Sequence, residues 1–136
     1  MTFDNLATLF ISWGWVVPPN HYESFKRYLH EMLRRKNVLI IWDGSLIEAV
    51  IFFFITNDYS KTYKKGIWDL VEDVSEGRQV YIDKLVCKQY TLNLRRKLQN
   101  LIEDAFPGQD EVHYLRAPRD RHVIIKRRGV LSHATV

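Results

Sequence analysis

A histidine and an aspartate, far apart in the chain, are the residues best suited to acid–base chemistry. His21 ends the segment SWGWVVPPNH, residues 12–21, at the expected start of a helix. Asp83 lies in EGRQVYIDKLVC, residues 76–87, in the middle of an apolar strand. Imidazole titrates near neutral pH, and the positive end of a helix favours its neutral form, so His21 could act as a general base with Asp83 as its partner. The alternative is a pair of structural residues, an exposed helix-start histidine and a solvent-facing strand aspartate.

Other residue types offer less chemistry. Cys87 is the only cysteine and precedes an expected helix start, where a lowered pKa would make it a nucleophile. A buried structural cysteine is the commoner outcome at such a position. The histidines show no metal-ligand spacing with one another or with Cys87, so the sequence predicts no metal. A G-x-S-x-G nucleophile motif is absent as well.

Composition fits a single globular domain over residues 1–136, with 46% hydrophobic residues available for a core. The lone cysteine excludes a disulfide framework within the chain. The first residues also lack a basic run followed by an apolar run, the pattern of a secretion signal. These two features predict a cytoplasmic protein. The longest apolar run, residues 49–55, is too short to span a bilayer and reads as a buried strand.

The formal net charge is +4, and the basic excess gathers toward the C-terminus. The residues concerned are Arg116, Arg119, Arg121, Lys126, Arg127 and Arg128. Such a surface could meet nucleic acid, an acidic carrier protein or the phosphates of a cofactor; the alternative is a solvated basic face. From about residue 127 we expect a loose basic end.

Hydrophobic periodicity supplies the elements that must position these residues. Helices are predicted over residues 4–15, 20–36 and 92–106, the last two with Asn20 and Thr91 as N-caps. Strands are predicted over residues 38–42, 46–56, 79–87, 111–116 and 122–126. Asp43-Gly44 predicts a hairpin between the first two strands, residues 57–66 a loop, and residues 67–74 a short helix. The order predicts an α/β (α+β) fold with a mixed, mostly antiparallel central sheet and helices on both faces.

This order resembles the core of the GNAT-like acyltransferase fold. Residues 12–21 are similar to the S-W-x-W-x-x-x-P-x-H segment of the lysine acyltransferases that activate RTX protein toxins. Residues 76–87 are similar to that family's glycine-turn-strand segment, which carries an aspartate. The resemblance implies that His21 is the catalytic histidine and Asp83 the functional aspartate. Some phage-encoded GNAT-like proteins share the same outline.

The resemblance implies an N-acyltransferase that moves an acyl group from a thioester, on acyl-carrier protein or coenzyme A, to a primary amine such as a protein lysine. The donor would be held by Val86, Cys87, Gln89, Thr91, Arg95 and Arg96. Residues 87–97, CKQYTLNLRRK, depart from the family pattern because they lack its glycine-rich pyrophosphate loop. Lys88-Gln89 also stands where the toxin-activating family tends to have proline. A non-catalytic GNAT-like module that binds nucleic acid or a partner protein is therefore the alternative, and a homodimeric or larger structural protein is a third.

Overall fold

The computed structural model of the chain describes residues 1–62, 64–116, 121–126 and 134–135, and the side chains of residues 1–62 and 64–114. The helical elements are α1 (Phe3–Ser12), the 3-10 turn η1 (Pro19–His21), α2 (Tyr22–Arg35), α3 (Tyr59–Thr62) and α4 (Leu92–Ala105). The strands are β1 (Val38–Asp43), β2 (Leu46–Thr56), β3 (Gln79–Cys87), β4 (Glu111–Arg116), β5 (Arg121–Lys126) and β6 (Ala134–Thr135).

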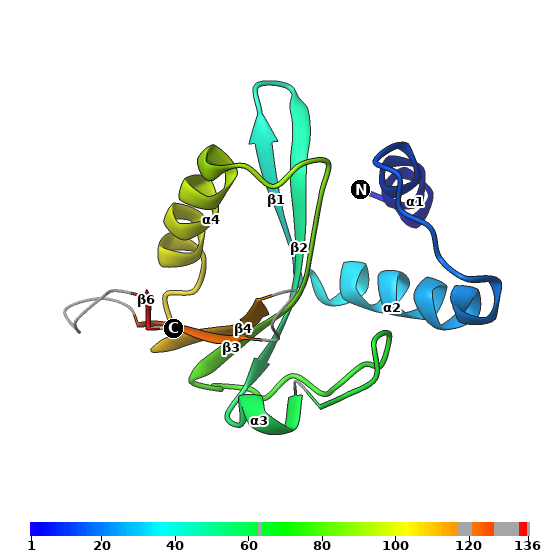
Figure 1. Cartoon of the computed structure of the whole chain (residues 1–136). Helices are drawn as coiled ribbons and strands as arrows, with labels where there is room; N and C mark the ends of the chain where they lie inside the picture. Colours follow the sequence, from blue (N-terminus) through cyan, green and yellow to red (C-terminus); the bar gives the residue numbers. More distant parts are fainter. Residues whose placement is uncertain (63, 117–120, 127–133, 136) are drawn as a thin grey trace.

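The strands form one six-stranded sheet in the order β1-β2-β3-β4-β5-β6. Neighbouring strands are antiparallel except for β3 and β4, which are parallel and joined by the crossover helix α4. Helices α1 and α2 cover one face of the sheet and α4 covers the other (Figure 1). The predicted fold class, a mixed and mostly antiparallel sheet with helices on both faces, is confirmed.

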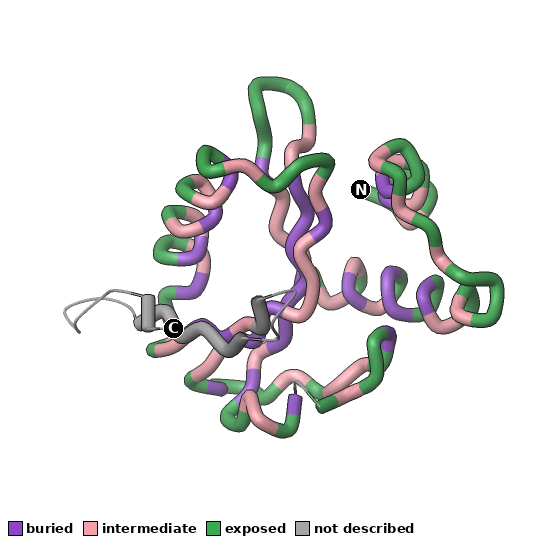
Figure 2. The backbone as a smooth tube through the Cα atoms, in the orientation of Figure 1, coloured by how far each residue is buried: buried purple, intermediate pink, exposed green. Residues whose placement is uncertain are grey.

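Each face of the sheet has its own apolar core, and β2 contributes to both because its side chains alternate. Val50, Phe52 and Phe54 pack toward α1 and α2, whereas Ile51 and Phe53 pack toward α4. Buried residues accordingly gather on the inward sides of the helices and along the central strands (Figure 2). The structure thus has two layers of helix around a sheet buried on both faces.

The start of α2 differs from the expectation. Asn20 was expected to cap this helix, but residues 19–21 form the turn η1 and His21 occupies the N-cap position without a side-chain cap bond. The prediction of Asn20 as the cap is wrong, because the adjacent prolines favour a short 3-10 turn in which the His21 N–H donates to the Pro18 carbonyl. The helix ends at Arg35, and its C-cap residue Lys36 adopts the left-handed conformation typical of a helix end.

Residues 67–74 were expected to form a short helix, and this prediction is wrong. They form turns and irregular backbone, while the short helix α3 falls within residues 57–66, where a loop was expected. Tertiary contacts replace helical bonds in the segment. The Asp73 carboxylate accepts the backbone N–H of Ile55 at 2.8 Å, and the Val74 N–H donates to the Ile55 carbonyl at 3.0 Å. Trp68 is buried against the core on the α1 and α2 face.

The first helix, expected over residues 4–15, ends at Ser12, and the remaining elements follow the expected ranges closely. Thr91 caps α4, its hydroxyl accepting the Leu94 N–H at 3.1 Å. The hairpin between β1 and β2 forms with Asp43 opposite Leu46, so the turn residues are Gly44 and Ser45. The side chains of the predicted basic surface lie outside the described part of the chain. The backbones of Arg116, Arg121 and Lys126 belong to β4 and β5. Arg119, Arg127 and Arg128 fall outside the described residues altogether.

Candidate functional site

A β-bulge in β3 determines where Asp83 points. In the pairing with β2, Phe52 faces Lys84 and Phe53 faces Ile82, so Asp83 is the extra residue on β3. A bulge breaks the alternation of side chains along a strand. Asp83 and Lys84, although consecutive, therefore both contact Tyr28 of α2. Bulges of this kind are over-represented beside active sites, where they redirect a side chain.

The Asp83 carboxylate is the centre of a buried polar cluster. Its Oδ2 atom accepts the Tyr28 hydroxyl at 2.6 Å and lies 3.0 Å from Nζ of Lys65 and 3.4 Å from Nζ of Lys84. The side chains of Asp83 and Lys65 are each 6% exposed, and that of Lys84 is 12% exposed. We refer to Tyr28, Lys65, Asp83 and Lys84 as the Asp83 cluster. Its charges interact in surroundings that screen them far less than water does.

Aromatic rings enclose the two lysines. Lys65 lies over the rings of Tyr28 and Phe54, with Nζ 5.5 and 5.6 Å from the ring centroids. Lys84 lies over Tyr28 and Trp68, with Nζ 5.2 and 4.7 Å from the ring centroids. Cation–π contacts of this kind partly replace the lost hydration of an ammonium group. The cluster thus combines two cations and one anion with an aromatic wall.

Burial shifts the ionisation of two members of the cluster. The pKa of Tyr28 is raised, first by burial and then by the negative charge and hydrogen bond of Asp83, so this residue stays a neutral donor. The pKa of Lys84 is lowered by burial, partly opposed by the attraction of Asp83 and reinforced by the repulsion of Lys65.

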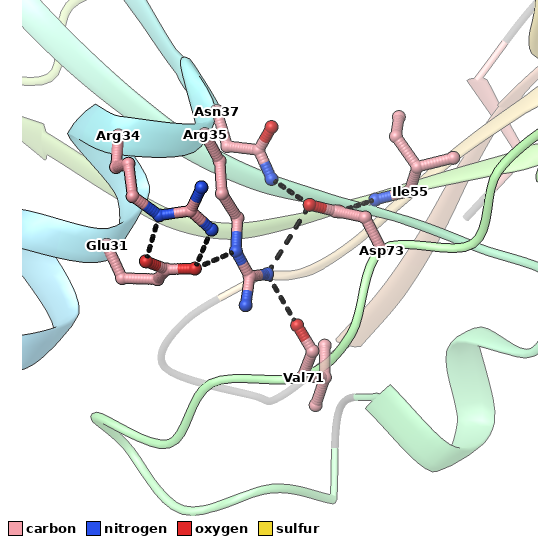
Figure 3. Close-up of polar contacts among 7 residues, drawn as sticks. All are labelled: Glu31, Arg34, Arg35, Asn37, Ile55, Val71 and Asp73. Atoms are coloured by element: carbon pink, nitrogen blue, oxygen red, sulfur yellow. Dashed lines mark hydrogen bonds and ion pairs between the residues drawn. The ribbon is translucent and has the colours of Figure 1, made fainter.

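The segment between β2 and β3 delivers Lys65 and Trp68 to the cluster, and a second polar network holds that segment. Arg35 at the end of α2 donates to the Val71 carbonyl at 2.6 Å. Asp73 accepts Asn37 Nδ2 at 2.7 Å as well as the Ile55 N–H (Figure 3). These bonds tie residues 71–73 to α2 and to β2 at the same time. They anchor the later part of the segment whose earlier part carries Lys65 and Trp68.

Among the described residues, no hydrogen bond or ion pair joins His21 to Asp83. His21 is half-buried at the start of α2, and its ring makes no hydrogen bond or ion pair with another described residue. Figure 1 shows this end of α2 at the outer edge of the molecule, away from β3. Asp83 instead uses Oδ2 for Tyr28 and the two lysines. A catalytic role for His21 stays a prediction.

Beyond the bulge, one edge of β3 has no strand partner among the described residues, and we call it the open edge. Its parallel pairing with β4 covers Gln79 to Ile82 and stops there, while its pairing with β2 continues to Cys87. On the β4 side, the backbone groups of residues 83–87 therefore have no strand partner in the described part of the chain. This edge leads to the start of α4, a 14-residue helix without an acidic residue in its first turn.

The residues predicted to hold a donor lie along this edge and the helix start. Val86 is buried and Cys87 half-buried in β3, while Gln89 and Arg96 are exposed and Thr91 and Arg95 half-buried. The Thr91 hydroxyl is occupied by the helix cap. Burial and the nearby Glu48 carboxylate raise the pKa of Cys87, which favours the unreactive thiol over a nucleophilic thiolate.

Sequence reasoning found Asp83 but missed Tyr28, Lys65, Lys84 and Trp68. One signal was present: Asp83-Lys84 places two charges side by side in a strand whose other residues, apart from Gln79 at its start, are apolar or aromatic. Strict alternation would send one of the two toward α4, so a bulge was the natural way to keep both together. The contribution of Lys65 had no local signal, because it comes from an irregular segment placed by tertiary bonds.

Among the described residues, no group of three or more histidine, cysteine or acidic side chains is arranged to hold a metal ion. Within the same part of the chain, no helix combines the length and apolar character needed to cross a membrane.

Comparison with known proteins gives no match, whether to protein-family models, to curated proteins or to solved structures.

Proposed function

We propose that the chain is an N-acyltransferase that moves an acyl group from a thioester donor to a primary amine. The observation that carries the proposal is the open edge of β3 over residues 83–87, between the bulge at Asp83 and the start of α4. The GNAT-like order of elements and the similarity of residues 12–21 and 76–87 to toxin-activating lysine acyltransferases support it from the sequence.

The open edge suits the donor for a chemical reason. Coenzyme A and acyl-carrier protein both carry the acyl group on an extended arm that contains amide groups and a phosphate. Amides can pair with an unpaired strand edge as an added strand would. The phosphate can bind at a helix N-terminus, where backbone N–H groups and the helix dipole favour negative charge. Leu92 and Asn93 supply backbone N–H groups there, and Arg95 follows two residues later in α4.

The reaction needs a base for the amine. The neutral amine attacks the thioester carbonyl, a C–N bond forms, and the C–S bond breaks to release a thiol. The candidate base comes from the sequence resemblance and not from a contact in the structure: in this proposal His21 takes the proton that the amine loses and returns it to the leaving thiolate. Asp83 acts as a positioning residue that, with Tyr28 and the two lysines, fixes the polar wall beside the bulge.

Release of free thiol from an acyl-coenzyme A and from an acyl-carrier protein, each with a primary amine as acceptor, tests the proposal. We expect His21→Ala to lower the rate by about 100-fold or more, in the range of general-base catalysis. His30→Ala is the matched control, because His30 is an exposed histidine of α2, the helix that His21 precedes. Equal rates for the two variants would remove His21 from the mechanism. Donor binding without any transfer would favour the non-catalytic binding module.

A further inference from the structure

The charges of the Asp83 cluster do not balance. Lys65 and Lys84 both approach one carboxylate oxygen, Oδ2 of Asp83. Tyr28 stays neutral because burial and Asp83 raise its pKa. No other acidic side chain forms an ion pair with either lysine among the described residues. With both lysines protonated, a buried site holds one more positive charge than negative charge, and buried charges are normally paired.

Hydrogen-bond donors are in excess at the same place. Each ammonium has three N–H donors. Lys65 forms an ion pair with Asp83 and donates to the Gly66 carbonyl, and Lys84 forms an ion pair with Asp83 and donates to the Ile67 carbonyl. Beyond these contacts, the remaining N–H of each lysine meets only aromatic faces among the described residues, so it is free to take a stronger acceptor.

Trp68 adds an independent observation. Its side chain is nine-tenths buried, with 9% relative exposure, and its Nε1 atom is a buried donor without a hydrogen-bond partner among the described residues. The ring of Trp68 lies 4.7 Å from Nζ of Lys84. A buried donor without an acceptor is destabilising, and such a group calls for a ligand or another explanation.

We propose that the Asp83 cluster and Trp68 bind a small oxyanion, a carboxylate or phosphate group, which accepts N–H bonds from Lys65, Lys84 and the Trp68 indole. One negative charge would neutralise the excess positive charge, and its several oxygen acceptors would serve the unused donors. The aromatic rings of Phe54 and Trp68 beside the lysines suit a ligand that carries an apolar group next to the oxyanion. This binding does not depend on acyl transfer.

The test follows the indole N–H signals of the full chain by two-dimensional NMR during titration with inorganic phosphate and, separately, with acetate at constant ionic strength. The chain has four Trp residues, so Trp68 can be assigned from the signal lost in Trp68→Phe. We expect a saturable shift of the Trp68 signal that exceeds the shifts of the other three indoles. A response to phosphate alone or to acetate alone identifies which oxyanion the site prefers.

A second measurement uses thermal unfolding. At ten times the dissociation constant of the anion, we expect the midpoint to rise by about 5 °C in the wild type. In the Lys84→Met variant this rise should disappear. The substitution also removes the excess positive charge of the cluster, so in chloride the variant should unfold at a temperature no lower than that of the wild type. Lys88→Met is the matched control, since Lys88 is an exposed lysine just beyond β3.

Phosphate could also bind at a different site, the start of α4. The Asn93→Asp variant distinguishes binding there from binding at the Asp83 cluster. This change places a negative charge at the helix start, so it should weaken binding there but leave the Trp68 response intact. An unmoved Trp68 signal with both anions, or equal shifts of all indole signals, would overturn the oxyanion proposal. Neither result would bear on acyl transfer, which is measured by thiol release.

Discussion

The hydrogen bond from Tyr28 to Asp83 is the contact that joins α2 to the bulge of β3, and Tyr28→Phe removes it alone. Tyr28 is fully buried, and its ring contacts Phe52, Phe54 and Trp68, which phenylalanine can keep. The lost bond is a 2.6 Å bond to a charged carboxylate whose side chain is 6% exposed. Hydrogen bonds to charged groups contribute about 1.5–3 kcal/mol. We expect a loss of about 2 kcal/mol in the free energy of unfolding.

Urea denaturation measures this loss, with a thermal midpoint lowered by roughly 5–10 °C as a second readout. Tyr22→Phe is the matched control, since Tyr22 lies in the same helix, is 45% exposed and has no hydroxyl hydrogen bond with a described residue. It should change stability by less than about 0.5 kcal/mol. The reasoning is refuted if Tyr28→Phe and Tyr22→Phe unfold at the same urea concentration.

The pH dependence of the same variant gives an internal check. Because the folded-state pKa of Tyr28 is raised, the unfolded chain loses the hydroxyl proton first as pH rises. The stability that this group contributes is therefore complete below about pH 10 and is lost above it. Wild type should lose stability above pH 10 more steeply than Tyr28→Phe. Parallel curves would show that Tyr28 ionises freely in the folded protein.

Three further predictions concern other contacts. Asp73→Ala should cost about 2–4 kcal/mol in urea denaturation, because the Ile55 N–H loses its acceptor, whereas the exposed Glu72→Ala should be nearly neutral. Gly77→Ala should cost about 1–3 kcal/mol, because a Cβ there would lie 2.8 Å from Ile55 Cγ2; a thermal midpoint equal to the wild-type value would contradict this. Burial lowers the pKa of His113, so stability should fall as pH drops below about 6.5, and His113→Gln should flatten that slope.

The sequence was sufficient for most of the sheet and its covering helices. The apolar runs of β2 and β3 and the helical spacing in α4 are local signals, so their ranges were predicted almost to the residue. The order of elements then left few ways to arrange the sheet. The errors at Asn20 and over residues 67–74 have different causes. Proline geometry outweighed the local pattern at Asn20, and tertiary hydrogen bonds outweighed it over residues 67–74.

The site was predictable only in part. Asp83 was found because a charge stood in an apolar strand, and Thr91 because threonine is a good helix cap. The grouping of Tyr28, Lys65 and Lys84 depends on a bulge and on the path of residues 57–78, which a single sequence does not encode in any short pattern. The role of a buried tyrosine as a donor to that carboxylate follows only from three-dimensional contact.

Binding of coenzyme A, measured by isothermal titration calorimetry, tests the proposed acyltransferase most directly. The comparison is between wild type, Asn93→Asp at the start of α4 and Asn100→Asp, an exposed position farther along the same helix. We predict saturable binding to the wild type, weakened about three- to tenfold by Asn93→Asp and unchanged by Asn100→Asp. No binding to the wild type, or equal weakening by both variants, would contradict a donor site at the open edge of β3 and the α4 start.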